Sequence, residues 1–211
     1  MKVAHVLYPG FTALDVVGAF QVFAAAPGVD PVFVALEPGP VPDDSGHCPL
    51  HAVKGFADVT AADVVVVPGS DGCGRPDVAV VAWLQLVHPT TCFTVSIATG
   101  SLCLAAAGLL EGGVAATHWA SAQELRRFGV TYSDERVVRH GKIFTAAGSS
   151  AGIDMALTLV GLTHGPAVAQ AVQLALQHDP QPPFDAGSPA TAPAQIGELV
   201  HAYYANRPKR Q

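Results

Sequence analysis

The chain has 211 residues, with 11 Lys and Arg against 17 Asp and Glu, and a formal net charge of -6. This acidic balance, without any basic cluster, argues against nucleic acid and anionic membranes as partners. The length suits a single domain, residues 1–211, whose core is large enough to fold without disulfides or metal ions.

Apolar runs and helical stretches alternate along the first half of the chain. A strand at residues 3–8 is followed by a helix capped by Thr12, a strand at 32–36, and a Pro- and Asp-rich segment at 37–49. The elements expected next are a strand at 64–67, a helix at about 76–87 and a strand at 93–97. The valine run at 64–67 is typical of a strand buried on both faces of a parallel sheet.

The second half continues the alternation and then becomes mostly helical. The elements expected there are a helix at 99–110, a strand at 114–117, a helix at 121–128, a strand at 143–146, and helices at 151–162, 166–177 and 194–203. This order predicts an α/β protein with a doubly wound, flavodoxin-like, mostly parallel sheet. Ligands of such sheets bind outside the carboxyl ends of the strands, which nominates the loops 9–15, 68–74 and 98–101.

The loop at residue 98 is the sharpest of the three. A strand passes directly into a helix there, so Ala98 occupies a tight turn that is either a catalytic elbow or only a strand–helix junction. The helix behind it offers free N–H groups, which stabilise an anion.

Few other side chains are candidates for chemistry. Asp15, flanked by apolar residues, is either a partly desolvated general acid–base or a solvated carboxylate near a helix start. His118 and Trp119 either line the pocket or pack in the core, and His5 within a strand is expected to be structural. Four aromatic side chains could likewise line an apolar pocket or belong to the core, namely Tyr8, Phe11, Phe20 and Trp119.

The four cysteines include no C-x-x-C pair and no zinc-binding spacing, so neither a disulfide nor a metal is expected. With no secretory signal and no apolar run of about 18 residues, the simplest location is a reducing cytoplasm. Cys103 is expected to be a buried small hydrophobe, and Cys73 is the thiol on the ligand-binding side of the sheet.

Six segments, in the same order, resemble the DJ-1/PfpI superfamily on its isocyanide-hydratase-like branch. They are residues 7–15, 66–69, 99–110, 117–121, 151–157 and 179–189. The resemblance covers nearly the whole chain and implies the fold of that family, a small-molecule substrate and no cofactor. It also implies a homodimer, for which the loop 179–193 and the helix 194–205 are candidate contacts.

The resemblance assigns roles to several positions. Relatives have a nucleophilic cysteine at the elbow, where this chain has Ala98. Asp15 matches the acid that assists proton transfer, and Thr99 matches the residue that hydrogen-bonds near the reacting atoms. The backbone from Gly69 to Gly72 is expected to close over the substrate like an oxyanion hole. The full set expected to bind substrate is Gly69, Ser70, Gly72, Gly100, His118 and Trp119.

The alanine at the elbow decides which mechanisms remain. A methyl group cannot attack an isocyanide, so hydration by the thiol route is not expected. Ser70 and Gln21 also depart from the usual glycine and acid of the family. Three functions stay open: a cofactor-free enzyme that uses Asp15 on an apolar small molecule, an isocyanide hydratase disabled by a Cys→Ala change (natural or introduced), and a non-catalytic sensor or binding module.

Overall fold

A computed structural model describes residues 1–70 and 75–206 of the chain. Two predicted positions, Gly72 and Cys73, lie outside the described residues. The chain divides into two compact units, Met1–Leu176 and Gln177–Gln211.

The first unit is built on one mostly parallel sheet. Its strand order is β10-β11-β7-β6-β1-β2-β5, and only β10 runs antiparallel to its neighbour. The strands are β1 (Lys2–Val6), β2 (Asp30–Ala35), β5 (Lys54–Gly55), β6 (Val64–Val67), β7 (Phe93–Ile97), β10 (Val137–His140) and β11 (Ile143–Ala146). The predicted doubly wound α/β class is confirmed.

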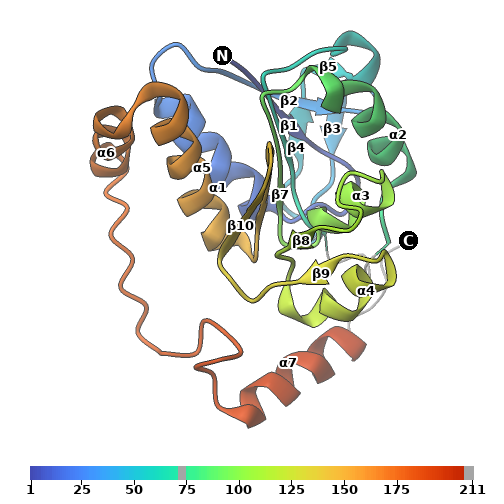
Figure 1. The fold of residues 1–211 in the computed structure, drawn as a ribbon, viewed down its shortest axis with the longest axis vertical. Helices are drawn as coiled ribbons and strands as arrows, with labels where there is room; N and C mark the ends of the chain where they lie inside the picture. Colours follow the sequence, from blue (N-terminus) through green and yellow to red (C-terminus); the bar gives the residue numbers. More distant parts are fainter. Residues whose placement is uncertain (71–74, 207–211) are drawn as a thin grey trace. The chain divides into compact units, whose positions relative to one another are not determined.

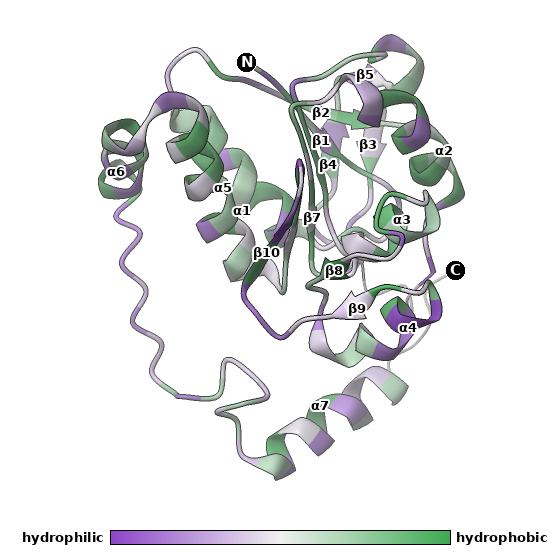
Figure 2. Ribbon diagram, in the orientation of Figure 1, coloured by the Kyte–Doolittle hydropathy of each residue, from purple (hydrophilic) through white to green (hydrophobic). Residues whose placement is uncertain are grey.

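Helices cover both faces of this sheet (Figure 1). One face carries α1 (Ala13–Ala25), α5 (Ser149–His164) and α6 (Pro166–Ala175), and the other carries α2 (Val78–Val87), α3 (Gly100–Ala106) and α4 (Ala122–Arg127). The valine run of β6 serves both cores, because Val65 and Val67 pack with the α2–α3 side and Val64 and Val66 with the α1–α5 side. Figure 2 shows hydrophilic residues on α4, which lies at the rim of the unit.

The structure corrects several expected boundaries. The Pro-rich segment at 37–49 contains a strand that was not predicted, β3 (Gly39–Val41), which pairs with β4 (Leu50–Ala52) directly after the segment. The helix predicted at 99–110 ends at Ala106, and Gly108 follows with a φ of 78°. The short strands β8 (Val114–Ala115) and β9 (Thr131–Tyr132) pair with each other. Single-turn 3₁₀ helices in the described part of the unit are η1 (Phe56–Asp58), η2 (His88–Thr90) and η3 (Trp119–Ser121).

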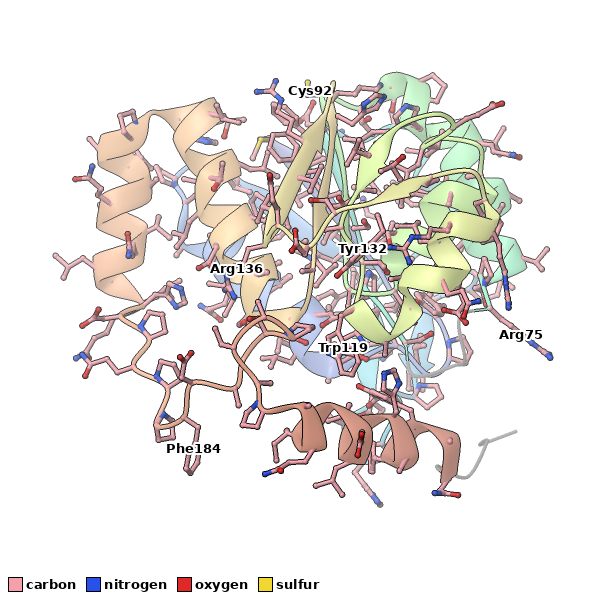
Figure 3. All side chains as sticks on the ribbon, turned by 60° about the horizontal axis from the view of Figure 1, so that its bottom comes forward. Arg75, Cys92, Trp119, Tyr132, Arg136 and Phe184 are labelled. Atoms are coloured by element: carbon pink, nitrogen blue, oxygen red, sulfur yellow. The ribbon has the colours of Figure 1, made fainter. Side chains whose placement is uncertain are left out.

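In the second unit, residues 179–193 form a connection without helix or strand, and α7 (Ala194–Asn206) follows it. Phe184 is 79% exposed and projects from this connection (Figure 3). Helix α7 has no fully buried residue. In the part of the chain that the structure describes, no helix has both the length and the apolar character needed to cross a membrane.

Candidate active site

The carboxyl ends of β1, β6 and β7 lie at one edge of the sheet, where hydrogen bonds join the turns after β1 and β6. Phe11 forms an antiparallel bridge with Ser70, and the Thr12 N–H donates to the Gly69 carbonyl over 2.8 Å. The buried Tyr8 hydroxyl donates to the Pro68 carbonyl, also over 2.8 Å. These bonds hold the turns after β1 and β6 together, as the doubly wound topology predicts.

Asp15 lies in the first turn of α1 and is 1% exposed. Its Oδ2 accepts a 2.8 Å hydrogen bond from the Gly69 N–H, whereas Oδ1 has no hydrogen-bond partner among the described residues. Burial raises the pKa of Asp15 from its ordinary 3.8 to about 6, and the nearby Asp44 carboxylate adds to this rise. The Ser149 hydroxyl and the Gly69 N–H act in the opposite direction by favouring the charged form.

Ala98 occupies the turn between β7 and α3 in the left-handed region, with a φ of 49°. A side chain other than glycine is disfavoured there by on the order of 1 kcal/mol. Its backbone is held on both sides, because its N–H donates to the Ala146 carbonyl over 2.9 Å and its carbonyl accepts from the hydroxyls of Ser101 (3.1 Å) and Thr117 (3.2 Å). The predicted tight turn therefore has the strained backbone of a catalytic elbow.

Sequence reasoning did not assign roles to Ser101 and Thr117. Both are fully buried, and both hydroxyls bind the Ala98 carbonyl. Each lies within a segment that carries the family resemblance, but the local pattern gives no sign that they act on the same atom. Thr117 directly precedes an unusual His-Trp pair, and this is the sequence signal that could have identified it.

Thr99 is adjacent to the elbow and is bound to the opposite loop. Its hydroxyl donates to the Ser70 carbonyl over 2.9 Å and accepts from the Ser70 N–H over 2.8 Å. Both hydrogen bonds fix the loop after β6 against the start of α3. The hydroxyl predicted to act near the reacting atoms thus also positions Ser70, which is itself a predicted substrate-binding residue.

Gly69 and Gly100 stand where two backbones approach closely. A Cβ added at Gly69 would lie 2.7 Å from Thr99 Oγ1 and 2.9 Å from Asp15 Oδ2. A Cβ added at Gly100 would lie 2.3 Å from the Val67 carbonyl oxygen. These separations are shorter than van der Waals contact, so only glycine fits at either position.

A Gly69→Ala variant is expected to lose stability and to disturb Asp15. The new methyl must push apart Thr99 and Asp15, and such overpacking costs about 1–3 kcal/mol. Urea unfolding measures this loss. Gly187→Ala is the matched control, since an added Cβ there meets no atom within 4 Å. Equal stability of the two variants would contradict the close approach at Gly69.

His118 and Trp119 follow directly after Thr117, whose hydroxyl donates to the carbonyl of the elbow residue Ala98. The His118 Nδ1 accepts a long hydrogen bond, 3.4 Å, from the Ala120 N–H and caps η3. Its ring centroid is 5.7 Å from that of Trp119, and burial lowers the pKa of His118. Their predicted contact with substrate stays a prediction.

No cysteine among the described residues occupies the elbow. Cys103 lies within α3 and is 2% exposed, and burial raises the pKa of its thiol from 9.0 to about 11, which makes it a poor nucleophile. Cys48 and Cys92 are exposed, and Cys92 directly precedes β7, at the edge of the sheet opposite the elbow. Within residues 1–70 and 75–206, no group of three His, Cys, Asp or Glu residues is placed to hold a metal ion.

A buried carboxylate lies beside a strained strand–helix turn at the carboxyl edge of a doubly wound sheet, which is where α/β proteins of this class bind their ligands. The DJ-1/PfpI family model matches residues 1–162. The chain belongs to the DJ-1/PfpI family.

Individual relatives refine this placement. The chain is 39% identical over 198 residues to the isonitrile hydratase of Pseudomonas putida, a match that covers 93% of this chain and 86% of that protein. The crystal structure of a ThiJ/PfpI family protein from Pseudomonas syringae is similar with a TM-score of 0.89 and 32% identity, and the match covers 97% of this chain and 87% of that one. The chain is therefore related to a hydratase-like group of enzymes.

A third relative is a regulator. The chain is 28% identical over 174 residues to the HTH-type transcriptional regulator CdhR of Pseudomonas aeruginosa, which covers 77% of this chain and 51% of the regulator. The chain thus spans about half the length of that protein.

Proposed function

We propose that the protein is a cofactor-free enzyme that acts on a neutral, apolar small molecule, with Asp15 as general acid and base and no cysteine nucleophile. The observation that carries this proposal is the Asp15 carboxyl group itself. It is buried, one oxygen is held by the Gly69 N–H over 2.8 Å, and Oδ1 has no partner in the described residues. Beside it, the elbow offers only the methyl group of Ala98.

The titration of Asp15 suits proton transfer in both directions. With a pKa of about 6, the carboxyl group is mostly ionised at neutral pH and can accept a proton, yet it holds that proton well enough to return it. The Gly69 N–H fixes Oδ2, so Oδ1 is the oxygen that would exchange the proton. Ser70, Thr99 and the predicted contacts at Gly100, His118 and Trp119 would orient the substrate.

The charges around Asp15 favour a neutral substrate. Asp44, a second carboxylate, is the charged residue whose field raises the pKa of Asp15. Its Oδ2 accepts from the Thr12 hydroxyl over 3.0 Å, which fixes this negative charge near the start of α1. An anionic substrate would be repelled by both carboxylates. Replacing a cysteine side chain by a methyl group also leaves more room, which suits a bulky aromatic molecule.

Asp15→Asn is expected to lower turnover by at least about 100-fold, because an amide cannot carry a catalytic proton. A panel of neutral aromatic compounds is incubated with the parent protein, and conversion is followed by mass spectrometry before the variant is assayed on each hit. Asp154→Asn is the matched control, since Asp154 lies on the outer side of α5 in an ion pair with Arg136. Undiminished turnover in Asp15→Asn would refute the proposed role.

The similarity to isonitrile hydratase favours a second candidate, a hydratase whose thiol has been replaced by the Ala98 methyl group. The regulator match favours a third, a ligand-binding module without catalysis. Compounds that bind without conversion would support the module, and activity restored by a cysteine at position 98 would support the hydratase.

We also propose that the chain forms a homodimer. Helix α7 exposes apolar side chains at helical spacing, with Ile196 37%, Leu199 65% and Tyr203 57% exposed. Light scattering coupled to size-exclusion chromatography would give twice the 21.7 kDa chain mass for a dimer.

A further inference from the structure

Helices α1 and α5 both begin at the carboxyl edge of the sheet and pack against each other there. Their contact is close, because a Cβ added at Gly18 would lie 3.0 Å from Cγ1 of Ile153. Asp15 precedes Gly18 by one helical turn, and Ser149 precedes Ile153 by one turn. Since residues three or four apart share a helix face, Asp15 and Ser149 face each other at the start of the helix pair.

This juxtaposition matters because Asp15 has an unused oxygen. Its Oδ1 is buried without a hydrogen-bond partner in the described residues, and a buried carboxylate oxygen of this kind is destabilising unless a donor reaches it. The first turn of the 16-residue helix α5 has backbone N–H groups without a side-chain cap, because its N-cap residue is Gly148, and it also carries the Ser149 hydroxyl. Rotation about the Cα–Cβ bond of Ser149 moves its hydroxyl relative to this oxygen.

We propose that Ser149 is the positioning residue of Asp15, whose Oδ1 it reaches by rotation of its hydroxyl and yields to the substrate. This inference rests on the proposed acid–base role of Asp15. The hydroxyl keeps the ionised carboxylate oriented with Oδ2 on Gly69 and Oδ1 toward α5. It also stabilises the charged form, which agrees with the lowering of the Asp15 pKa by Ser149.

Other groups around Asp15 do not supply this interaction. Asp44, on the loop after β3, carries the same charge and raises the pKa of Asp15. Tyr8, two residues after β1, donates its hydroxyl to the Pro68 carbonyl, and burial raises the pKa of its phenol well above 10, so it remains neutral. Gly69 donates to Oδ2. Ser149 is therefore the side chain placed to act on Oδ1.

The chain provides a matched control in the next residue. The Ser150 hydroxyl accepts a 3.4 Å hydrogen bond from Arg136, which is also paired with Asp154. Ser150 is exposed, and it lies at the same helix start as Ser149. Loss of the Ser150 hydroxyl should leave Asp15 unchanged, while any general effect of a serine-to-alanine change in this turn would appear in both variants.

The test is the titration of Asp15, followed through its side-chain carboxyl carbon by ¹³C NMR in the full-length protein, with Asp15→Asn to assign the signal. Ser149→Ala is expected to move the midpoint upward by about one pH unit, because a hydrogen bond to the charged form is lost. Ser149→Thr, which keeps the hydroxyl, should restore the parent midpoint, and Ser150→Ala should not move it.

An unchanged midpoint in Ser149→Ala would overturn the inference, and so would an equal shift in Ser150→Ala. Because this titration needs no substrate, it is independent of the turnover assay that tests the role of Asp15. A shifted midpoint together with full turnover of Asp15→Asn would establish the Ser149 contact and refute the catalytic proposal.

Discussion

An Ala98→Cys variant is expected to hydrate an aryl isocyanide to its N-formamide at least about 1000-fold faster than the parent chain, which has no nucleophile at this position. The expectation combines the 39% identity to an isonitrile hydratase with the geometry of the elbow. The backbone at residue 98 already has a φ of 49°, held by hydroxyls of Ser101 and Thr117. A cysteine therefore enters a turn that is already shaped for a nucleophile.

The expected hydration in the Ala98→Cys variant needs only the new thiol, the Asp15 carboxyl group and water. The thiolate attacks the isocyanide carbon, and that carbon receives a proton, for which Asp15 is the nearby acid, to give a thioimidate. Water then adds to the same carbon and the thiolate leaves, so the net reaction joins one water to one isocyanide. With a pKa of about 6, Asp15 can give and recover the proton near neutral pH.

Product formation is measured by chromatography against an authentic N-formamide. The double variant Ala98→Cys with Asp15→Asn should lose most of the gained activity. Ala98→Ser is the matched control for side-chain size, since a hydroxyl has a much higher pKa than a thiol and is a far weaker nucleophile. Failure of Ala98→Cys to form product would count against the hydratase candidate, and hydration by the parent chain would contradict the expectation that isocyanide hydration needs a thiol at position 98.

The sheet and the elbow could be predicted from the sequence because their signals are local. Four consecutive valines indicate a strand buried on both faces, and β6 matches residues 64–67. A strand that runs directly into a helix indicates a tight turn, and Ala98 has the positive φ that such a turn requires. The edge strand β10 was missed because its Arg139 and His140 are exposed and give no apolar pattern.

The contacts within the site could not be predicted, because they join residues far apart in the chain. The Gly69 bond to Asp15 spans 54 residues, and the Thr117 bond to the Ala98 carbonyl spans 19. The location of the aromatic side chains could not be predicted either. Tyr8 and Phe11 lie in the core, with exposures of 6% and 0%, and sequence alone left open whether they line a pocket.

A second large effect is expected in the pH dependence of stability, and it originates at His5. His5 is 1% exposed, its two ring nitrogens have no partner in the described residues, and its ring centroid is 5.3 Å from Phe20 and 5.8 Å from Phe23. Burial lowers the pKa of His5 from 6.5 to about 3. Between these values the unfolded chain binds a proton that the folded chain does not, so stability decreases as the pH is lowered, by about 1.4 kcal/mol per pH unit.

Asp15 acts in the opposite direction over part of this range. Its pKa is raised from 3.8 to about 6, so between these values the folded chain binds the extra proton, and acidification favours folding. From pH 6 to 3.8 the two contributions cancel. As the pH is lowered, His5 therefore reduces the stability of the parent chain only between pH 6.5 and 6 and between pH 3.8 and 3, by about 2 kcal/mol in total.

Asp15→Asn removes the compensation, so the contribution of His5 should appear over its whole range, about 5 kcal/mol between pH 6.5 and 3. Adding His5→Leu to Asp15→Asn should abolish this slope and also stabilise the chain at pH 7, because two unpaired buried nitrogens are removed. Urea unfolding at several pH values measures both effects, with His51→Gln, a change at an exposed histidine, as control. If Asp15→Asn and the parent chain lose stability in parallel between pH 6 and 4, the burial of the Asp15 carboxyl group does not oppose that of His5, and the acid–base assignment loses its main physical support.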